Sequence, residues 1–227
     1  DALRADNLEE LMEIISSEPL HYEPGTKYLY GINQSILGRV AEVASGKSFD
    51  VFLKEYLFDP LEMYKSGFYL DKKTKKLLQP LYVSGEIMEG FNEDGITRIG
   101  NMMTYNKDSQ TPLGAEGILT TSGDFSNFCK MLLNNGNFNG KQILNPQSIK
   151  LMTSKFSEGY PEEYWGERYF LGFYKGLSVY VLEDPNKMNL KAPTGIFGWS
   201  GLQNTFFWID PKNSIYGILL SRSMSSG

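Results

Sequence analysis

Cysteine and histidine are almost missing from this sequence, which has one of each among its 227 residues. Because Cys129 is alone, no internal disulfide can form, and redox chemistry is not expected. A zinc site takes three or four ligands, mostly Cys or His, and the chain cannot supply that set without an unusual cluster of carboxylates. The sequence therefore predicts no metal centre and no cofactor.

Long apolar runs are also missing. The longest ones, such as residues 206–209 and 218–220, are far too short to cross a bilayer, and no basic leader precedes an apolar run at the N-terminus. The net charge of −5 argues against nucleic acid as a partner, because a surface that follows phosphates needs an excess of Lys and Arg. With 41% hydrophobic residues, the chain can build a sizeable core in one large domain or two small ones.

The single histidine also limits the choice of hydrolytic mechanism. Ser200 lies in a Gly-Trp-Ser-Gly stretch that resembles a nucleophile elbow, but that motif needs a strand, a tight turn and then a helix. Residues 205–209 are β-branched or aromatic, so they predict a strand instead. His21 also precedes Ser200, which is the wrong order for such a triad. Ser200 is therefore not predicted to be a nucleophile.

Helical signals dominate the first 60 residues and return near the middle of the chain. Asp6 and Glu9 form a capping box, and the apolar residues after them repeat at helical spacing until Pro19. The same reasoning predicts further helices that begin near Gln34, Ser48, Ser122 or Asp124, and Asn145. Cys129 lies on the apolar face of the helix that ends at Gly136, so we expect a core residue rather than a reactive thiol.

Strand signals dominate the C-terminal part of the chain. Two hairpins are predicted, one over residues 170–182 with its turn at Lys175 and Gly176, and one over residues 205–220 with its turn at 210–213. A short strand is expected over residues 66–70, after which residues 71–112 lose any periodicity. Helices first and antiparallel strands afterwards indicate an α+β protein rather than a βαβ array.

Two short motifs carry a resemblance to a known family. One spans residues 24–32 around Tyr30, with Leu37 and Gly38 downstream, and the other is the Trp-Ser-Gly of residues 199–201. They are similar to two of the three active-site motifs of the serine β-lactamase, penicillin-binding protein and carboxylesterase superfamily. In that superfamily a Ser-x-x-Lys helix, a tyrosine loop and a Lys-Thr-Gly type strand meet in one cleft.

The resemblance extends over nearly the whole chain. Four further blocks follow in the order and spacing typical of the superfamily, at residues 38–63, 66–70, 117–152 and 208–224. The step from Tyr30 to Gly38, together with a Trp where many members have Lys or His, is most similar to the carboxylesterase branch. The resemblance implies a β-lactamase-like fold, in which an antiparallel sheet packs against a helical block, over a single domain of residues 1–227.

The resemblance also implies roles for individual residues. Tyr30 matches the loop tyrosine that, with the lysine of the serine's helix, moves a proton off the nucleophile and onto the leaving group. The backbone amide of Leu202 matches the strand donor of the oxyanion hole. The residues implied in substrate binding are Ile32, Trp199, Ser200 and Gly201. The alternatives are that Tyr30 is one of 14 tyrosines used for packing and that Trp199 is a core aromatic.

Two departures from the family pattern change the expected substrate. Trp199 stands where a lysine usually gives a substrate carboxylate its charged partner. Ile32 stands where an asparagine often binds the substrate amide, although Asn33 is one residue away. We therefore expect neutral esters to be favoured over β-lactams or D-alanyl amides. The resemblance slightly favours a bacterial periplasmic or secreted location.

The nucleophile of the family is missing, because no Ser-x-x-Lys occurs in the 227 residues. In the family that helix precedes the segment matched here, and a further strand or helix follows it. We therefore expect a serine hydrolase domain truncated at both ends and inactive on its own. The alternative is a catalytically inactive homologue that binds acyl or peptide ligands.

Overall fold

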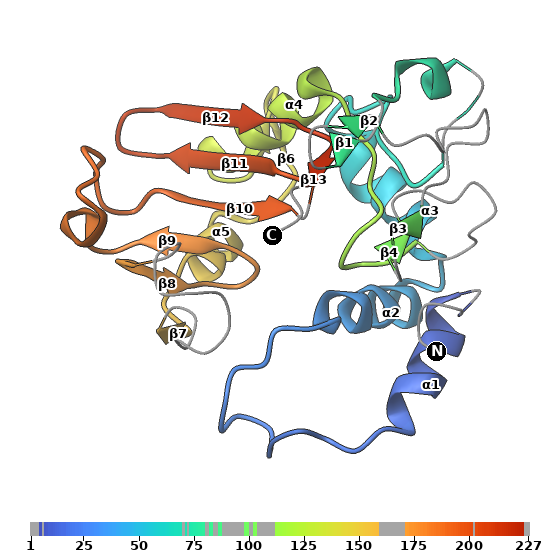
Figure 1. Ribbon diagram of the computed structural model, residues 1–227. Helices are drawn as coiled ribbons and strands as arrows, with labels where there is room; N and C mark the ends of the chain where they lie inside the picture. The colour runs from blue at the N-terminus through green and yellow to red at the C-terminus, as the bar shows by residue number, and fades with distance from the viewer. Residues whose placement is uncertain are drawn as a thin grey trace. The chain divides into compact units, whose positions relative to one another are not determined.

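The chain forms two compact units, shown in Figure 1, with bounds Asp1–Thr121 plus Ser225–Gly227 for the first and Ser122–Met224 for the second. The structure is a computed structural model, and it describes residues 5, 7–69, 71, 73–79, 82–83, 86–87, 98–99, 102–103, 112–158, 171–201 and 203–224. The single domain expected from the sequence stays a prediction.

The first unit begins with helix α1 (Leu8–Ser16). Its N-cap is Asn7, whose side chain accepts a hydrogen bond from the Glu10 amide at 2.9 Å, so the prediction that Asp6 caps this helix is wrong. Asp6 itself lies outside the described residues. Leu8 and Leu11 are buried. Leu8 packs against Gly38, where an added Cβ would lie 3.2 Å from the Leu8 Cδ1 atom.

Helix α2 (Asn33–Ser45) ends at Gly46, which is left-handed with φ of 69°, as the sequence predicts. Helix α3 (Phe49–Leu53) follows and continues into a π-helical segment, Lys54–Phe58, which periodicity alone does not reveal. Ser48 is the N-cap residue, but the Phe49 amide donates to the carboxylate of Glu42 at 2.9 Å. The start of α3 is therefore tied to α2.

The rest of the first unit has little regular structure among its described residues. A 3-10 turn (Thr74–Leu77) is followed by two short antiparallel pairs, β1 (Tyr82–Val83) with β2 (Glu86–Ile87) and β3 (Arg98–Ile99) with β4 (Met102–Met103). The strand expected over residues 66–70 is reduced to one bridge, Gly67 to Leu119. The other described residues between 66 and 70 form no ladder, and Leu70 lies outside the described part.

The second unit contains a fully antiparallel six-stranded sheet in the order β12-β11-β10-β9-β8-β7. Its strands are β7 (Ser157–Glu158), β8 (Phe173–Lys175), β9 (Tyr180–Leu182), β10 (Phe197–Gly201), β11 (Thr205–Asp210) and β12 (Ile215–Leu219). A 3-10 turn (Pro185–Met188) precedes β10, and β13 (Ser223–Met224) follows β12. The sheet and the helices confirm the α+β class predicted from the sequence.

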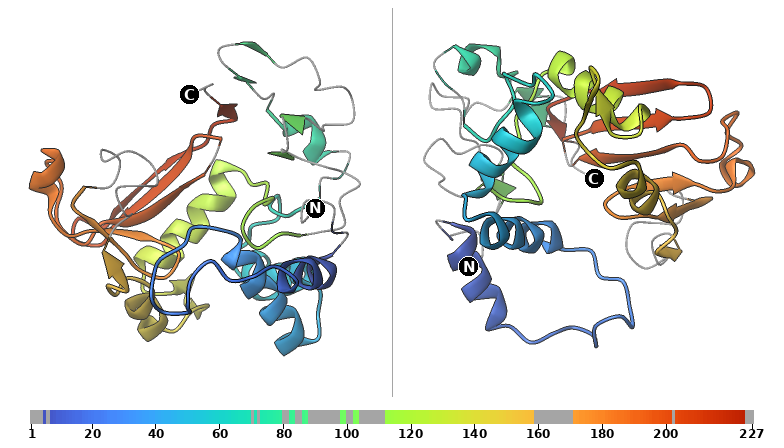
Figure 2. Two further views of the ribbon diagram at one scale, coloured as in Figure 1. Left: turned by 60° about the horizontal axis from the view of Figure 1, so that its bottom comes forward. Right: turned by 180° about the vertical axis from the view of Figure 1, so that it is seen from behind.

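Helix α4 (Ser122–Leu133) packs on β11 and β12, as the rear view in Figure 2 shows. Phe125 and Phe128 meet the ring of Phe207 edge-on, with centroids 5.2 and 6.2 Å away. The Ser126 hydroxyl also pairs with that of Tyr216. The hairpin β5 (Asn137–Phe138) and β6 (Lys141–Gln142) and helix α5 (Pro146–Met152) follow α4 along the chain.

Cys129 lies on α4 with no exposed surface, and burial raises the pKa of its thiol to about 12. The prediction of a core cysteine is confirmed. The turn predicted at Lys175 and Gly176 is wrong at its first residue, because Lys175 belongs to β8 and pairs with Tyr180. The chain turns over residues 176–179, where Ser178 adopts φ of 62° and the Gly176 amide donates to the Val179 carbonyl at 2.9 Å.

Candidate functional site

The loop between α1 and α2 carries the tyrosine motif. Gly25, at φ of 81°, makes the turn, and both the amide and the hydroxyl of Thr26 donate to the Glu23 carbonyl, at 3.1 and 2.6 Å. The Lys27 ammonium lies 4.8 Å from the ring centroid of Tyr22. These contacts shape the part of the loop that precedes Tyr30.

Tyr30 lies at the end of this loop, three residues before α2, and 43% of it is exposed. A tyrosine used for core packing would be buried, so this exposure disfavours the packing alternative. Helix α2 holds the loop from the other side, because the Asn33 side-chain amide donates to the Leu29 carbonyl at 3.2 Å. The Tyr30 ring is thus presented on a segment anchored at both ends.

Ile32, expected from the sequence to contact the substrate, and its neighbour Asn33 lie where the loop meets α2. Ile32 is the N-cap residue of α2 and is 41% exposed, and its carbonyl accepts the Ser35 amide at 2.8 Å. The Asn33 Nδ2 atom is already bonded to the loop carbonyl of Leu29. Asn33 therefore stabilises the loop, and Ile32, two residues after Tyr30, presents an apolar side chain.

Strand β10 carries the second motif on a firmly paired backbone. It pairs with β11 along its full length, from Phe197 with Ile209 to Gly201 with Thr205. On the other side, β9 pairs only with Phe197 and Gly198. The edge of Ser200 and Gly201 that faces away from β11 therefore has no strand neighbour among the described residues.

The two glycines of β10 have different surroundings. A Cβ at Gly198 would lie 2.0 Å from the Phe207 carbonyl oxygen, so only glycine fits this backbone. A Cβ at Gly201 would meet the side-chain oxygen of Thr205 at 2.3 Å. The expected role of Gly201, close approach of substrate, stays a prediction. Leu202, the predicted oxyanion donor, lies outside the described residues.

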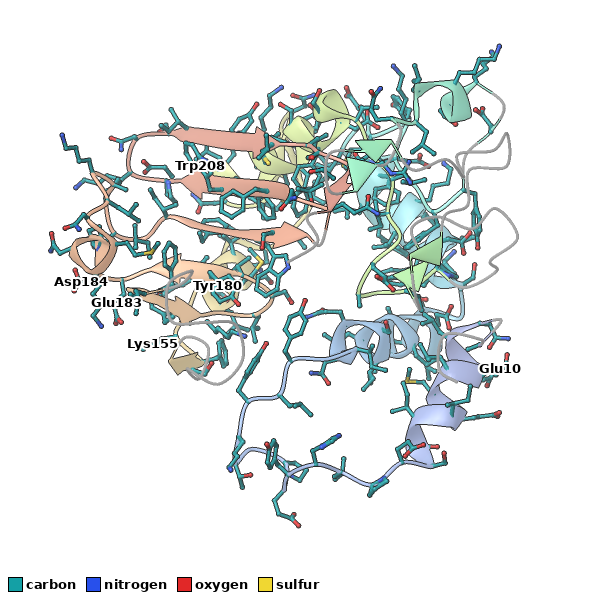
Figure 3. The ribbon with its side chains drawn as sticks, viewed as in Figure 1. Glu10, Lys155, Tyr180, Glu183, Asp184 and Trp208 are labelled. Carbon is teal, nitrogen blue, oxygen red and sulfur yellow. The ribbon has the colours of Figure 1, made fainter. Side chains whose placement is uncertain are left out.

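Trp199 is half-buried and stacks on a residue that no sequence motif singles out. The rings of Trp199 and Tyr180 are nearly parallel, at 5°, with centroids 4.6 Å apart. The Lys175 ammonium lies 5.3 Å from the Tyr180 centroid. These three residues come from the successive strands β10, β9 and β8, and Tyr180 is labelled on the middle strand in Figure 3.

Lys175 is a buried basic residue in this cluster, only 5% exposed. Burial disfavours the charged ammonium and lowers the pKa of Lys175 from 10.5 to about 7. No local signal in the sequence predicts this, because a lysine before a glycine is typical of an exposed turn. The tertiary fold buries the side chain instead, with its nitrogen over the ring of Tyr180.

The predicted site residues thus fall into two groups. Tyr30 and Ile32 share one loop of the first unit, and Trp199, Ser200 and Gly201 share one strand of the second. In the described part of the chain, no cluster of His, Cys, Asp and Glu side chains is suited to a metal ion. Nor does any helix there have the length and apolar character to span a membrane.

Comparison with known proteins gives a consistent result. A family model described as Beta-lactamase matches residues 1–227. An Escherichia coli K12 protein, named as a candidate D-alanyl-D-alanine carboxypeptidase, is 24% identical over 239 residues, covering 99% of this chain and 52% of that protein. A lovastatin esterase of Penicillium rubens is 26% identical over 222 residues, covering 92% of this chain and 53% of the esterase. The chain spans about half the length of these relatives.

A solved structure shows the same fold. The hydrolase EstCE1, described as having promiscuous acyltransferase activity, superposes with a TM-score of 0.76 at 20% identity, covering 96% of this chain and 57% of EstCE1. The β-lactamase-like architecture expected from the two motifs is therefore confirmed.

Proposed function

Because this chain belongs to the β-lactamase family, a family of hydrolases, we propose that it forms part of a serine hydrolase that cleaves neutral esters through an acyl-enzyme. The nucleophilic serine and its lysine belong, in this proposal, to a part of the protein outside these 227 residues, which contain no Ser-x-x-Lys. This chain contributes Tyr30 and strand β10.

Each group has a defined task in this proposal. The serine oxygen attacks the ester carbonyl while its proton passes to the Tyr30 oxygen, whose own proton moves to the neutral lysine amine. The lysine then returns a proton through Tyr30 to the leaving alkoxide, which departs as the alcohol. The Leu202 amide donates to the oxygen that becomes negative in the tetrahedral intermediate. Water then attacks the acyl-enzyme, releasing the acid and restoring the serine.

One observation carries the preference for neutral esters. Trp199 precedes Ser200 on β10, and it offers a half-buried indole stacked on Tyr180 rather than a cation. Ile32 beside the catalytic tyrosine is likewise apolar and 41% exposed. A substrate carboxylate gains no charged hydrogen bond from either residue, whereas an uncharged acyl or alcohol group keeps its apolar contacts.

The test is Tyr30→Phe in the protein that carries the Ser-x-x-Lys segment, with p-nitrophenyl acetate as substrate. Loss of the hydroxyl should lower turnover by about 10²-fold or more, the scale of a general acid or base, while the ring keeps its packing. Tyr22→Phe is the matched control, because Tyr22 lies in the same loop and is similarly exposed. Unchanged turnover with an altered melting temperature would show that Tyr30 is structural.

Covalent labelling distinguishes this proposal from an inactive homologue. A serine reacts with fluorophosphonates only when a neighbouring base activates it. The isolated 227 residues should therefore resist labelling, and the longer protein should label once, at the serine of its Ser-x-x-Lys. A longer protein that resists the reagent would favour a homologue that only binds acyl or peptide ligands.

A further inference from the structure

We propose that Tyr180 is a positioning residue that sets substrate specificity, because its ring holds the Trp199 indole in the orientation that an apolar substrate group meets. The inference rests on the proposed function, since it assumes that Trp199 contacts the substrate. Tyr180 is 4% exposed, so it acts through Trp199 and not by touching the substrate itself.

The geometry of the stack supports this role. Parallel rings with centroids 4.6 Å apart share a large contact area, and any tilt of the indole about its side-chain bonds would break that contact. Trp199 is half-buried, whereas Tyr180 is in the core. The stack therefore connects a partly accessible ring to an immobile one.

The backbone explains why Trp199 needs such a support. Pairing between β9 and β10 stops at Gly198 and Tyr180, so beyond this pair β11 is the only strand that flanks β10 among the described residues. Gly198 brings no side chain against the indole. Where the backbone pairing of β9 and β10 ends, the contact between the Trp199 and Tyr180 rings links the two strands instead.

Lys175 holds Tyr180 from the next strand. The two residues form a cross-strand pair between β8 and β9, and the ammonium lies 5.3 Å from the Tyr180 centroid. Lys175 is 5% exposed, so its side-chain nitrogen lies against the ring with water largely excluded, and below pH 7 its positive charge adds a cation–π attraction. Tyr180 is therefore fixed by Lys175 on one neighbouring strand and stacked on Trp199 from the other.

A fixed indole has a consequence for substrate choice. A large apolar acyl group that meets a ring already held in place loses less free energy on binding than one that must order the ring first. A small acetyl group covers little of the ring and gains little from its orientation. Tyr180 should therefore affect KM for longer acyl chains and leave kcat for acetate nearly unchanged.

The experiment is a double-mutant cycle in the protein that carries the Ser-x-x-Lys segment, with p-nitrophenyl acetate and p-nitrophenyl hexanoate as substrates. Tyr180→Leu should raise KM for the hexanoate by about 2- to 10-fold, the worth of an aromatic pair, and change kcat for the acetate little. Tyr180→Phe keeps the ring and should restore the wild-type KM. In a Trp199→Leu background, Tyr180→Leu should have no further effect on KM.

The outcomes separate this inference from the proposed function. If Tyr180→Leu raises KM for the hexanoate equally in the wild-type and the Trp199→Leu backgrounds, the positioning role is wrong. It is also wrong if Tyr180→Leu leaves the ratio of KM for the hexanoate to KM for the acetate unchanged. Turnover that Tyr30→Phe leaves unchanged, or a wild-type protein that hydrolyses neither ester, would instead overturn the proposed function. If Tyr180→Leu does not fold, Tyr180→Met, which is unbranched and adaptable, replaces it. If both unfold, Tyr180 is a core residue and the inference is wrong.

Discussion

The indole of Trp208 covers the backbone of Gly217 on the neighbouring strand, and a Cβ at position 217 would lie 2.4 Å from the indole Cε2 atom. The pair joins the two strands on which α4 packs. An aromatic ring over a strand glycine fills the space that a side chain would otherwise occupy.

Gly217→Ala should therefore destabilise the protein by about 1 to 3 kcal/mol, the range for inserting a methyl group into a packed site. Urea unfolding measures the change. Gly67→Ala is the control, since no heavy atom lies within 4 Å of the position that its Cβ would take and it should have little effect. Trp208→Leu combined with Gly217→Ala should cost less than the sum of the two single changes, and strict additivity would contradict this account.

Lys175 should make stability depend on pH. Its pKa is about 7 in the folded chain against an ordinary value of 10.5, so above pH 7 the unfolded chain holds a proton that the folded chain lacks. The free energy of unfolding should therefore rise with pH, by at most about 1.4 kcal/mol per pH unit from this group. Lys175→Met should remove the rise, whereas Lys212→Met, at an exposed turn, should keep it.

The measurement is urea unfolding between pH 7 and pH 8.5. The upper limit matters because burial raises the pKa of Cys129 from 9.0 to about 12, so above pH 9 its thiol lowers stability as pH rises. If Lys175→Met and the wild type show the same slope below pH 8.5, then Lys175 is protonated in the folded chain at these pH values.

Cys129 should resist thiol reagents in the folded chain. It has no exposed surface, and its raised pKa leaves almost no thiolate at pH 8. Ellman's reagent should react slowly with the native protein and release one equivalent per chain in urea, because the sequence has one cysteine. Rapid stoichiometric reaction without urea would mean that α4 opens readily from the sheet.

Trp199→Lys should shift the substrate preference toward β-lactams and D-alanyl peptides. A charged hydrogen bond to a substrate carboxylate is worth roughly 1.5 to 3 kcal/mol, or about tenfold to a hundredfold in kcat/KM. The assay compares p-nitrophenyl acetate with a penicillin in the protein that carries the nucleophile. A wild-type protein that already prefers penicillins would show that the argument from Trp199 and Ile32 is wrong.

Local sequence signals account for most of the helices and for the strands around residues 205–219. Helix α2 is an example, because its apolar spacing and Gly46 depend only on neighbours in the sequence. The π-helical segment at Lys54–Phe58 has no such signal, since its side chains repeat like those of an ordinary helix. Among the described residues, the strand expected near residue 67 pairs only through the bridge from Gly67 to Leu119.

The sequence predicts those candidate-site residues that lie in short motifs, but not those that join the site only through tertiary contacts. Trp199 and Tyr30 are recognised from residues adjacent to them in sequence. Tyr180 and Lys175 enter only because three strands meet in one sheet and bring separate segments together. Sequence signals place Lys175 in a turn because charged residues usually stay in water, and the fold overrides that preference by burying the whole side chain, its nitrogen included.

Along β10, the residues that anchor the strand are followed directly by those proposed to contact the substrate. Phe197 is buried and Gly198 admits no side chain, whereas Trp199 and Ser200 are half-buried on a backbone that β11 already holds. Side chains at these two positions can therefore change with little effect on the strand register. A combinatorial library at positions 199 and 200, with 197 and 198 kept as they are, can therefore test the proposed role of β10 in substrate choice without disturbing the strand.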